Sequence, residues 1–247
     1  MSNKTGKVSG LSLDAVSDDL FGLSFKALRS VRVLWLQPRK YFEASKQADW
    51  GGIYTPSIRL WLSFFALFSA LKFWWIGDNV GMIEAFATGF ENAGLVLPEG
   101  VTYEEVGRET VLWVFSTVTV LQAIAMVLLS LVYSAWGEAT TLAQRQRYLF
   151  AVIVPGASLM PISMTLMMLV PGAWLTAYGI GLAVVTYLVD FLSGYRGGFA
   201  EVSGFARVWR AALLAFILVI VNVLLSIGTQ IAGILTVGQR FAVPVAG

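Results

Sequence analysis

Long uncharged stretches alternate with short polar segments along most of this chain. Five of these stretches reach the roughly 20 apolar residues that a helix needs to cross the hydrocarbon core of a bilayer. They cover residues 58–77, 110–136, 148–170, 173–193 and 209–235. Pro171-Gly172, a pair typical of a tight hairpin, divides the third from the fourth. The pattern predicts an all-α, polytopic membrane helix bundle with five transmembrane helices.

The same pattern divides the chain into three parts. Residues 1–57 form a polar and amphipathic N-terminal segment, residues 58–237 form the membrane domain, and residues 238–247 form a short external tail. The first 26 residues lack the apolar core of a cleaved signal peptide. We therefore expect the mature chain to begin at Met1.

Amphipathic helices are expected at the membrane surface. In the stretch Ser17–Gln37, Ser17 is a plausible N-cap, and apolar residues recur every three or four positions. They are Phe21, Phe25, Leu28 and Val31, with Trp35, and they are flanked by the basic residues Lys26, Arg29 and Arg32. Such a helix suits the headgroup plane of anionic lipids, and it equally suits packing on the protein's own helices or on a partner.

Further surface helices follow from local signals. Pro38 predicts a short second helix over Arg39–Gln47, and helical spacing predicts another over Asp78–Asn92. Thr102 and Glu105 have the spacing of a capping box at the start of the second span. Trp74 and Trp75, at the end of the first span, are expected at the headgroup level.

Charge sets the expected orientation. Lys and Arg gather before the first span and in the loops after the second and fourth, whereas the loop after the first span is acidic. That loop carries Asp78, Glu84, Glu91, Glu99, Glu104, Glu105 and Glu109 against Arg108. Because short cytoplasmic loops are rich in Lys and Arg, we expect a cytoplasmic N-terminus and an external C-terminus, in a bacterial inner membrane.

Composition supports the membrane class and narrows the chemistry. Of the residues, 57% are hydrophobic and 13% are charged, about half the charged share of a soluble domain. Cys and His are absent, which removes thiolate and imidazole chemistry and the usual ligands of zinc, copper and haem. We expect no catalytic, cofactor or metal site, and the formal charge of +2 gives no sign of nucleic-acid binding.

Ionisable residues inside spans are candidate functional groups, because burying one in lipid costs about 2.5–3.5 kcal/mol on insertion scales. Only Asp190 and Lys72 qualify. For Asp190, an ion pair with a loop arginine (Arg196, Arg207 or Arg210) is favoured over proton or ion coupling. Lys72 is expected to snorkel to the interface. The amides of Gln122, Asn222 and Gln230 are expected to form interhelical hydrogen bonds.

The third span is unusual in its composition. Pro155 and Pro161 each remove a backbone donor and should kink the helix. Together with Met164 and Asp190 they could line a ligand groove, although packing irregularity explains the same residues. In the fourth span, Ala173, Ala177 and Gly181 form a strip suited to close helix packing.

Two short motifs resemble the Yip domain family of five-span membrane proteins and its bacterial members. The first motif is Pro38-x-x-x-Phe42, followed by Trp50 and Pro56. The second is the run 144–150, Gln-Arg-Gln-Arg-Tyr-Leu-Phe, leading into the prolines of the third span. The resemblance implies a non-enzymatic membrane organiser, a family role that in eukaryotes involves Rab GTPases.

These observations lead to two functional hypotheses. The leading one is a membrane scaffold or accessory subunit of a larger assembly, whose partners are anionic lipids and either other membrane subunits or further copies of the chain. The alternative is a small transporter or lipid-handling protein that uses the kinked third span and Asp190.

Overall fold

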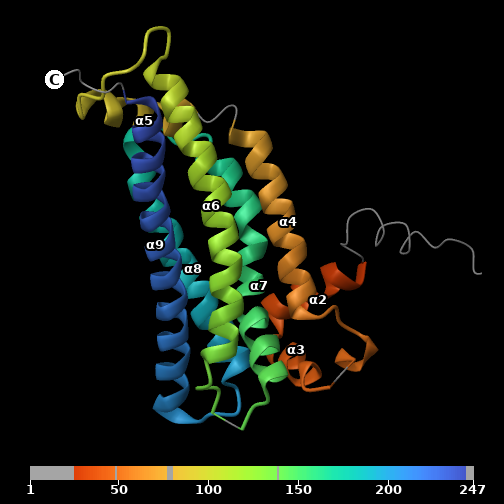
Figure 1. Cartoon of the computed structure of the whole chain (residues 1–247). Helices are drawn as coiled ribbons and strands as arrows, with labels where there is room; N and C mark the ends of the chain where they lie inside the picture. The colour runs from red at the N-terminus through yellow and green to blue at the C-terminus, as the bar shows by residue number, and fades with distance from the viewer. Residues whose placement is uncertain (1–24, 48, 77–79, 138, 243–247) are drawn as a thin grey trace, which may run out of the picture.

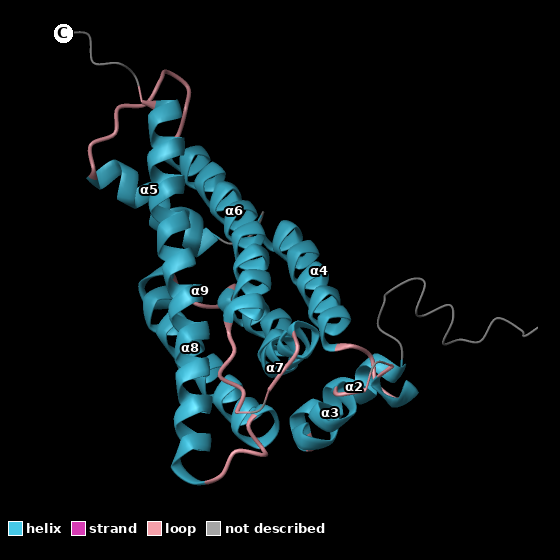
Figure 2. Cartoon of the chain, turned by 60° about the horizontal axis from the view of Figure 1, so that its bottom comes forward, coloured by secondary structure: helices cyan, strands magenta, loops and turns pink. Residues whose placement is uncertain are grey.

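The described part of the chain is helical. A computed structural model describes residues 25–47, 49–76, 80–137 and 139–242, and within these ranges helices are joined by short loops and no strand occurs (Figures 1 and 2). Four segments among them are long and apolar enough to cross a membrane. They are α6 (Tyr103–Val132), α7 (Leu142–Met167), the segment Gly172–Gly198 that contains α8 (Leu175–Ser193), and α9 (Gly204–Phe241). The chain is thus an all-α integral membrane protein.

A further long helix, α4 (Ser57–Ile76), lies beside this group and contacts α6 and α7 (Figure 1). It covers the first of the five expected spans, but it is not one of the four segments above. The side chains of Trp74 and Trp75 lie outside the described part of the structure, so their expected place at the interface stays a prediction.

The helix boundaries follow local capping. The expected capping box between Thr102 and Glu105 is formed and starts α6, so this helix begins before residue 110. A second box, between Thr141 and Gln144, starts α7 earlier than the expected residue 148. Both prolines lie inside α7, which continues as one helix to Met167. α9 likewise extends beyond residues 209–235 at both ends.

The second span ends earlier than expected. α6 stops at Val132, and Trp136, expected at the end of the span, is almost completely buried. Its ring stacks on Phe199 at 5.2 Å between centroids and meets Tyr148 edge-on at 5.3 Å. Burial of this aromatic cluster, rather than a headgroup contact, holds the end of α6 against α7 and the π-helix Gly194–Gly198.

At the same end of the bundle, residues 25–47 and 49–55 form what we call the N-terminal module: α2 (Phe25–Leu36), α3 (Pro38–Ser45) and the short 3₁₀ helix Trp50–Gly52. Arg147 of α7 donates to the carbonyls of Ser45 and Gln47, at 2.8 and 2.7 Å. Arg196 donates to the carbonyl of Leu36 at 3.0 Å. The module is therefore fixed to the helices rather than attached loosely.

The face that α2 buries against the bundle is not its predicted apolar face. Its small or slender residues Ala27, Ser30 and Leu34 are buried, because they allow close approach to α3 and α7. Phe25 and Leu28, two residues of the predicted apolar face, are 70% and 57% exposed, so they do not pack on the protein's own helices, and their contact with lipid or a partner stays a prediction. Phe21 and the proposed N-cap Ser17 lie outside the described residues.

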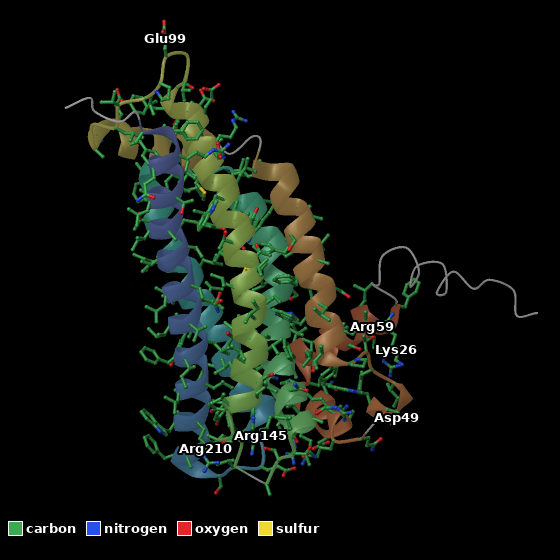
Figure 3. All side chains as sticks on the ribbon, viewed as in Figure 1. Lys26, Asp49, Arg59, Glu99, Arg145 and Arg210 are labelled. Carbon is green, nitrogen blue, oxygen red and sulfur yellow. The ribbon has the colours of Figure 1, made fainter. Side chains whose placement is uncertain are left out.

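The opposite end of the bundle carries α5 (Val80–Asn92), which covers most of the expected surface helix and packs on α6 (Figure 1). The labelled basic residues lie at one end of the bundle. Lys26, Arg59, Arg145 and Arg210, together with the acidic Asp49, lie at the end that holds the N-terminal module, whereas Glu99 lies at the α5 end (Figure 3).

Candidate functional site

A pair of amides links α6 and α9 near the middle of both helices. Gln122 Nε2 donates to Asn222 Oδ1 at 2.7 Å, and Asn222 Nδ2 donates to the carbonyl of Leu218 at 2.9 Å. The interhelical hydrogen bond predicted for these two residues is confirmed. Gln230 instead donates to Ser226, one turn away on its own helix, at 3.2 Å.

Lys72 of α4 is also buried inside the bundle. Only 5% of this residue is exposed, and its Nζ donates to Thr119 Oγ1 of α6 at 2.7 Å. The rings of Phe68 and Phe115 lie 4.2 and 5.1 Å from Nζ, close enough for cation–π attraction. The expectation that Lys72 snorkels to the interface is wrong, because the hydroxyl and the two rings give its ammonium a binding place inside the bundle.

Asp190 is the second buried charge-bearing residue. It is 3% exposed, and its Oδ1 accepts no hydrogen bond from any residue in the described ranges. It lies beside Gly156 of α7, where an added Cβ would come within 3.3 Å of Oδ1. Glycine at position 156 therefore gives the carboxyl group its place between α7 and α8.

The expected ion pair of Asp190 with a loop arginine does not form among the described residues. Arg196 donates to the carbonyl of Leu36, and Arg207 donates to the carbonyl of Tyr195 at 2.6 Å. The π-helix after α8 explains both contacts, because it places Arg196 against the N-terminal module and the carbonyl of Tyr195 beside Arg207 at the start of α9.

Lys72, Asp190, Gln122 and Asn222 all line one cavity of about 140 Å³. Every one of α4, α6, α7, α8 and α9 contributes to its wall. The remaining lining residues are apolar or small, apart from Thr186: Trp61, Phe64, Phe65, Phe68, Met126, Ile153, Gly156, Ala157 and Met160. A water molecule occupies about 30 Å³ of liquid, so the cavity has room for a few waters or one small ion. We call it the polar cavity.

The predicted ligand groove is brought together only in part. Asp190 lines the polar cavity, and Pro155 precedes the lining residue Gly156. Pro161 and Met164 are not among the residues that line this cavity. The sequence did not predict that Lys72 and Asp190 line one cavity, because sequence alone does not show which way each residue faces within its helix.

The predicted lipid-contacting residues of α2 lie at the surface of the protein. Lys26, Arg29 and Arg32 are exposed, and the Arg29 guanidinium lies 6.0 Å from the centre of the Tyr54 ring. Trp35 is partly exposed and its Nε1 donates to Ser158 Oγ of α7 at 3.1 Å, so it also ties α2 to the bundle.

The fold and the polar cavity together define a helical integral membrane protein with ionisable residues buried between its helices. Comparison of the chain with known protein families, with curated proteins and with solved structures found no match. The resemblance to the Yip domain family therefore stays a prediction.

Proposed function

We propose that this protein is a small membrane transporter in which Asp190 binds and releases a proton within the polar cavity. One observation carries the proposal: a buried carboxyl oxygen without a hydrogen-bond partner in the described structure lines the same mid-bundle cavity as a buried lysine. Ionisable residues placed in this way mark ion and proton pathways in membrane proteins.

A purely structural role explains Asp190 poorly. A buried polar group without a partner costs about 1–3 kcal/mol of stability. A leucine or alanine at this position would avoid that cost, and no ion pair among the described residues offsets it. Lys72, by contrast, is bonded to Thr119. In the proposed mechanism its ammonium sets the positive field of the cavity, and Asp190 carries the exchangeable proton.

The proposal includes five spans, with α4 as the first. In support, α4 lies along α6 and α7, and its residue Lys72 contributes to the polar cavity (Figure 1). The basic end that carries Lys26, Arg145 and Arg210 would face the cytoplasm of a bacterial inner membrane, and the acidic end near Glu99 would face outward (Figure 3).

Proton flux in liposomes tests this function. The purified chain is reconstituted into vesicles loaded with a pH-sensitive dye, and proton uptake is followed after a potassium diffusion potential is imposed. Asp190→Asn keeps the size of the side chain but removes its carboxyl, so we expect flux to fall to the level of empty vesicles. Glu99→Gln, which changes an exposed acid of the outer loop, is the matched control and should keep the flux.

A second measurement does not depend on transport. A hydrophobic carbodiimide, which reacts with protonated carboxyl groups in apolar surroundings, should modify Asp190 in the folded protein, and mass spectrometry of the peptides locates the adduct. Full proton flux in the Asp190→Asn protein, or wild-type vesicles no leakier than empty ones, would overturn the proposal.

A scaffold or accessory-subunit role is the second candidate. It is supported by the strip Ala173, Ala177 and Gly181, which is exposed in the structure and so is not used for packing within the chain. A partner helix could approach closely there. Extraction of the protein in native-like lipid, followed by mass spectrometry, tests this role. Protein partners that recur with the wild type and are absent from the Ala177→Trp variant would support it. A particle that contains only this chain and lipid would count against it.

α2 supplies the proposed contact with anionic lipid. Phe25 and Leu28 are exposed beside Lys26, Arg29 and Arg32, an arrangement suited to the headgroup region. Replacing the three basic residues with Gln should reduce the share of anionic lipid that travels with the protein. An unchanged lipid composition would show that this face does not select headgroups.

A further inference from the structure

A second and larger cavity lies in the half of the bundle that carries α5. Its volume is about 720 Å³, within the range of about 300–1,000 Å³ typical of ligand pockets. α5, α6, α8 and α9 form its walls, and α7 adds only Met167. We call it the outer cavity, and it shares no lining residue with the polar cavity.

Two glycines widen the outer cavity. Gly89 of α5 and Gly179 of α8 both line it, and a Cβ added at either position would meet nothing within 4 Å. The cavity therefore has open space beside both α5 and α8 at these positions.

The position of α5 keeps the outer cavity from closing. An added Cβ at Gly107 of α6 would lie 2.6 Å from the carbonyl oxygen of Ile83, so α5 rests directly on the α6 backbone. At its other side, Gly81 approaches the backbone of Gly172 in the α7–α8 hairpin, where an added Cβ would lie 3.3 Å from the Gly172 nitrogen. Through these two contacts α5 connects α6 to the α7–α8 hairpin across the outer cavity.

The lining favours a hydrocarbon chain. Met82, Phe86, Phe90 and Phe115 supply aromatic and thioether surface. Two polar side chains of the wall are already bonded, since Tyr178 donates to the carbonyl of Ser163 and Gln230 donates to Ser226. Gly179 and Ile234 are exposed at the protein surface, so the cavity opens sideways where acyl chains surround a bundle of this class.

The end of the bundle that carries the outer cavity is acidic. The described residues at this end include Glu84, Glu91, Glu99, Glu104, Glu105 and Glu109. Arg108 and Arg240, the basic residues described there, each pair with a glutamate, Glu104 and Glu109 respectively. An anionic headgroup would be repelled by this surface, whereas the ammonium of a zwitterionic headgroup would be attracted.

We infer that the outer cavity binds one acyl chain of a zwitterionic, amine-bearing phospholipid. The inference goes beyond the proposed transport function and does not depend on Asp190. It assigns the glycines at 89 and 179 to a lipid-binding site, and α5 to the cover of that site.

Photo-crosslinking tests the inference on the full chain in lipid nanodiscs. One probe is a phosphatidylethanolamine with a diazirine in its acyl chain, and the second is a phosphatidylglycerol with the same chain. We expect the first probe to label peptides of α5, α8 and α9 that line the outer cavity, and the second to label them less.

Two variants separate binding in the cavity from general contact with lipid. Gly179→Trp should fill the space and abolish the cavity crosslinks. Gly228→Trp is the matched control, because Gly228 lies on α9, another helix of the cavity wall, with open space around it, but does not itself line the cavity, and it should keep the crosslinks. Gly89→Leu should fill the same space from α5 and also abolish the cavity crosslinks. Agreement between the two variants would show that the loss does not come from a folding defect at position 179.

Three results would overturn the inference. One is labelling of Gly179→Trp and Gly89→Leu at the wild-type level. Another is labelling spread evenly over all lipid-facing helices. The third is stronger labelling of the cavity by the anionic probe.

Discussion

The contact of α5 with Gly107 gives a prediction that can be worked out from the geometry. In Gly107→Ala, the new Cβ would stand 2.6 Å from the carbonyl oxygen of Ile83 and 3.1 Å from the nitrogen of Ala87. Both are backbone atoms of α5, so no side chain can rotate out of the way. α5 would have to move by roughly 1 Å to restore a normal contact distance.

Gly89→Ala is the matched control for this change. Both glycines lie within helices, so each alanine gains the same helix propensity, about 1 kcal/mol. Position 89 has open space, and only position 107 forces a displacement. Overpacking of a tight contact costs about 1–3 kcal/mol, which is then the expected difference in unfolding free energy between the two variants.

Thermal unfolding in one detergent, followed by tryptophan fluorescence, measures this difference. For a chain of this size, about 2–4 °C in Tm corresponds to 1 kcal/mol, so Gly107→Ala should melt roughly 2–12 °C below Gly89→Ala. If Gly107→Ala melts at the same temperature as the control or higher, α5 does not rest on the α6 backbone as described.

Two further predictions concern the amide pair and a buried tyrosine. A double-mutant cycle with Gln122→Leu and Asn222→Leu should give a coupling energy of about 0.6 kcal/mol and at most about 1.7, measured by unfolding in detergent, and additive effects would contradict the bond. Burial raises the pKa of Tyr41, whose hydroxyl donates to the carbonyl of Thr55 at 2.6 Å, above the value of 10.0 for an exposed tyrosine. As the pH rises above 10, the unfolded chain therefore loses this proton before the folded protein does. The wild type should then lose stability relative to Tyr41→Phe. Parallel profiles of stability against pH for the two proteins would refute this.

The sequence predicted the elements better than their contacts. The uncharged stretches located α4, α6, α7, α8 and α9, since the length of hydrocarbon to be crossed limits the alternatives. The predicted helix boundaries were less accurate where the prediction did not use a capping motif. The box between Thr141 and Gln144 is readable in the sequence and would have placed the start of α7.

The polar cavity shows the same limit at the level of single residues. Residue type and position singled out Asp190 and Lys72 as costly inside a membrane, and that reasoning required no structure. Their surroundings depend on the rotation and depth of each helix, which a hydropathy pattern does not contain. Thr119 and Gly156, which give the two side chains their places, carry no signal of their own.

The docked N-terminal module has a consequence for biosynthesis. It leaves the ribosome before the helices on which it docks, and the ion pair between Lys46 and Glu201 joins positions 155 residues apart. At about 5–20 residues per second, translation needs roughly 8–30 s to supply that surface. During this interval Phe42, which packs against Tyr148 and lies beside Gly197 in the finished fold, lacks part of its docking site. Nascent chains stalled before residue 201 should therefore be more open to protease in this module than full-length chains, and a chaperone or the membrane surface would have to shelter it until the last helices are made.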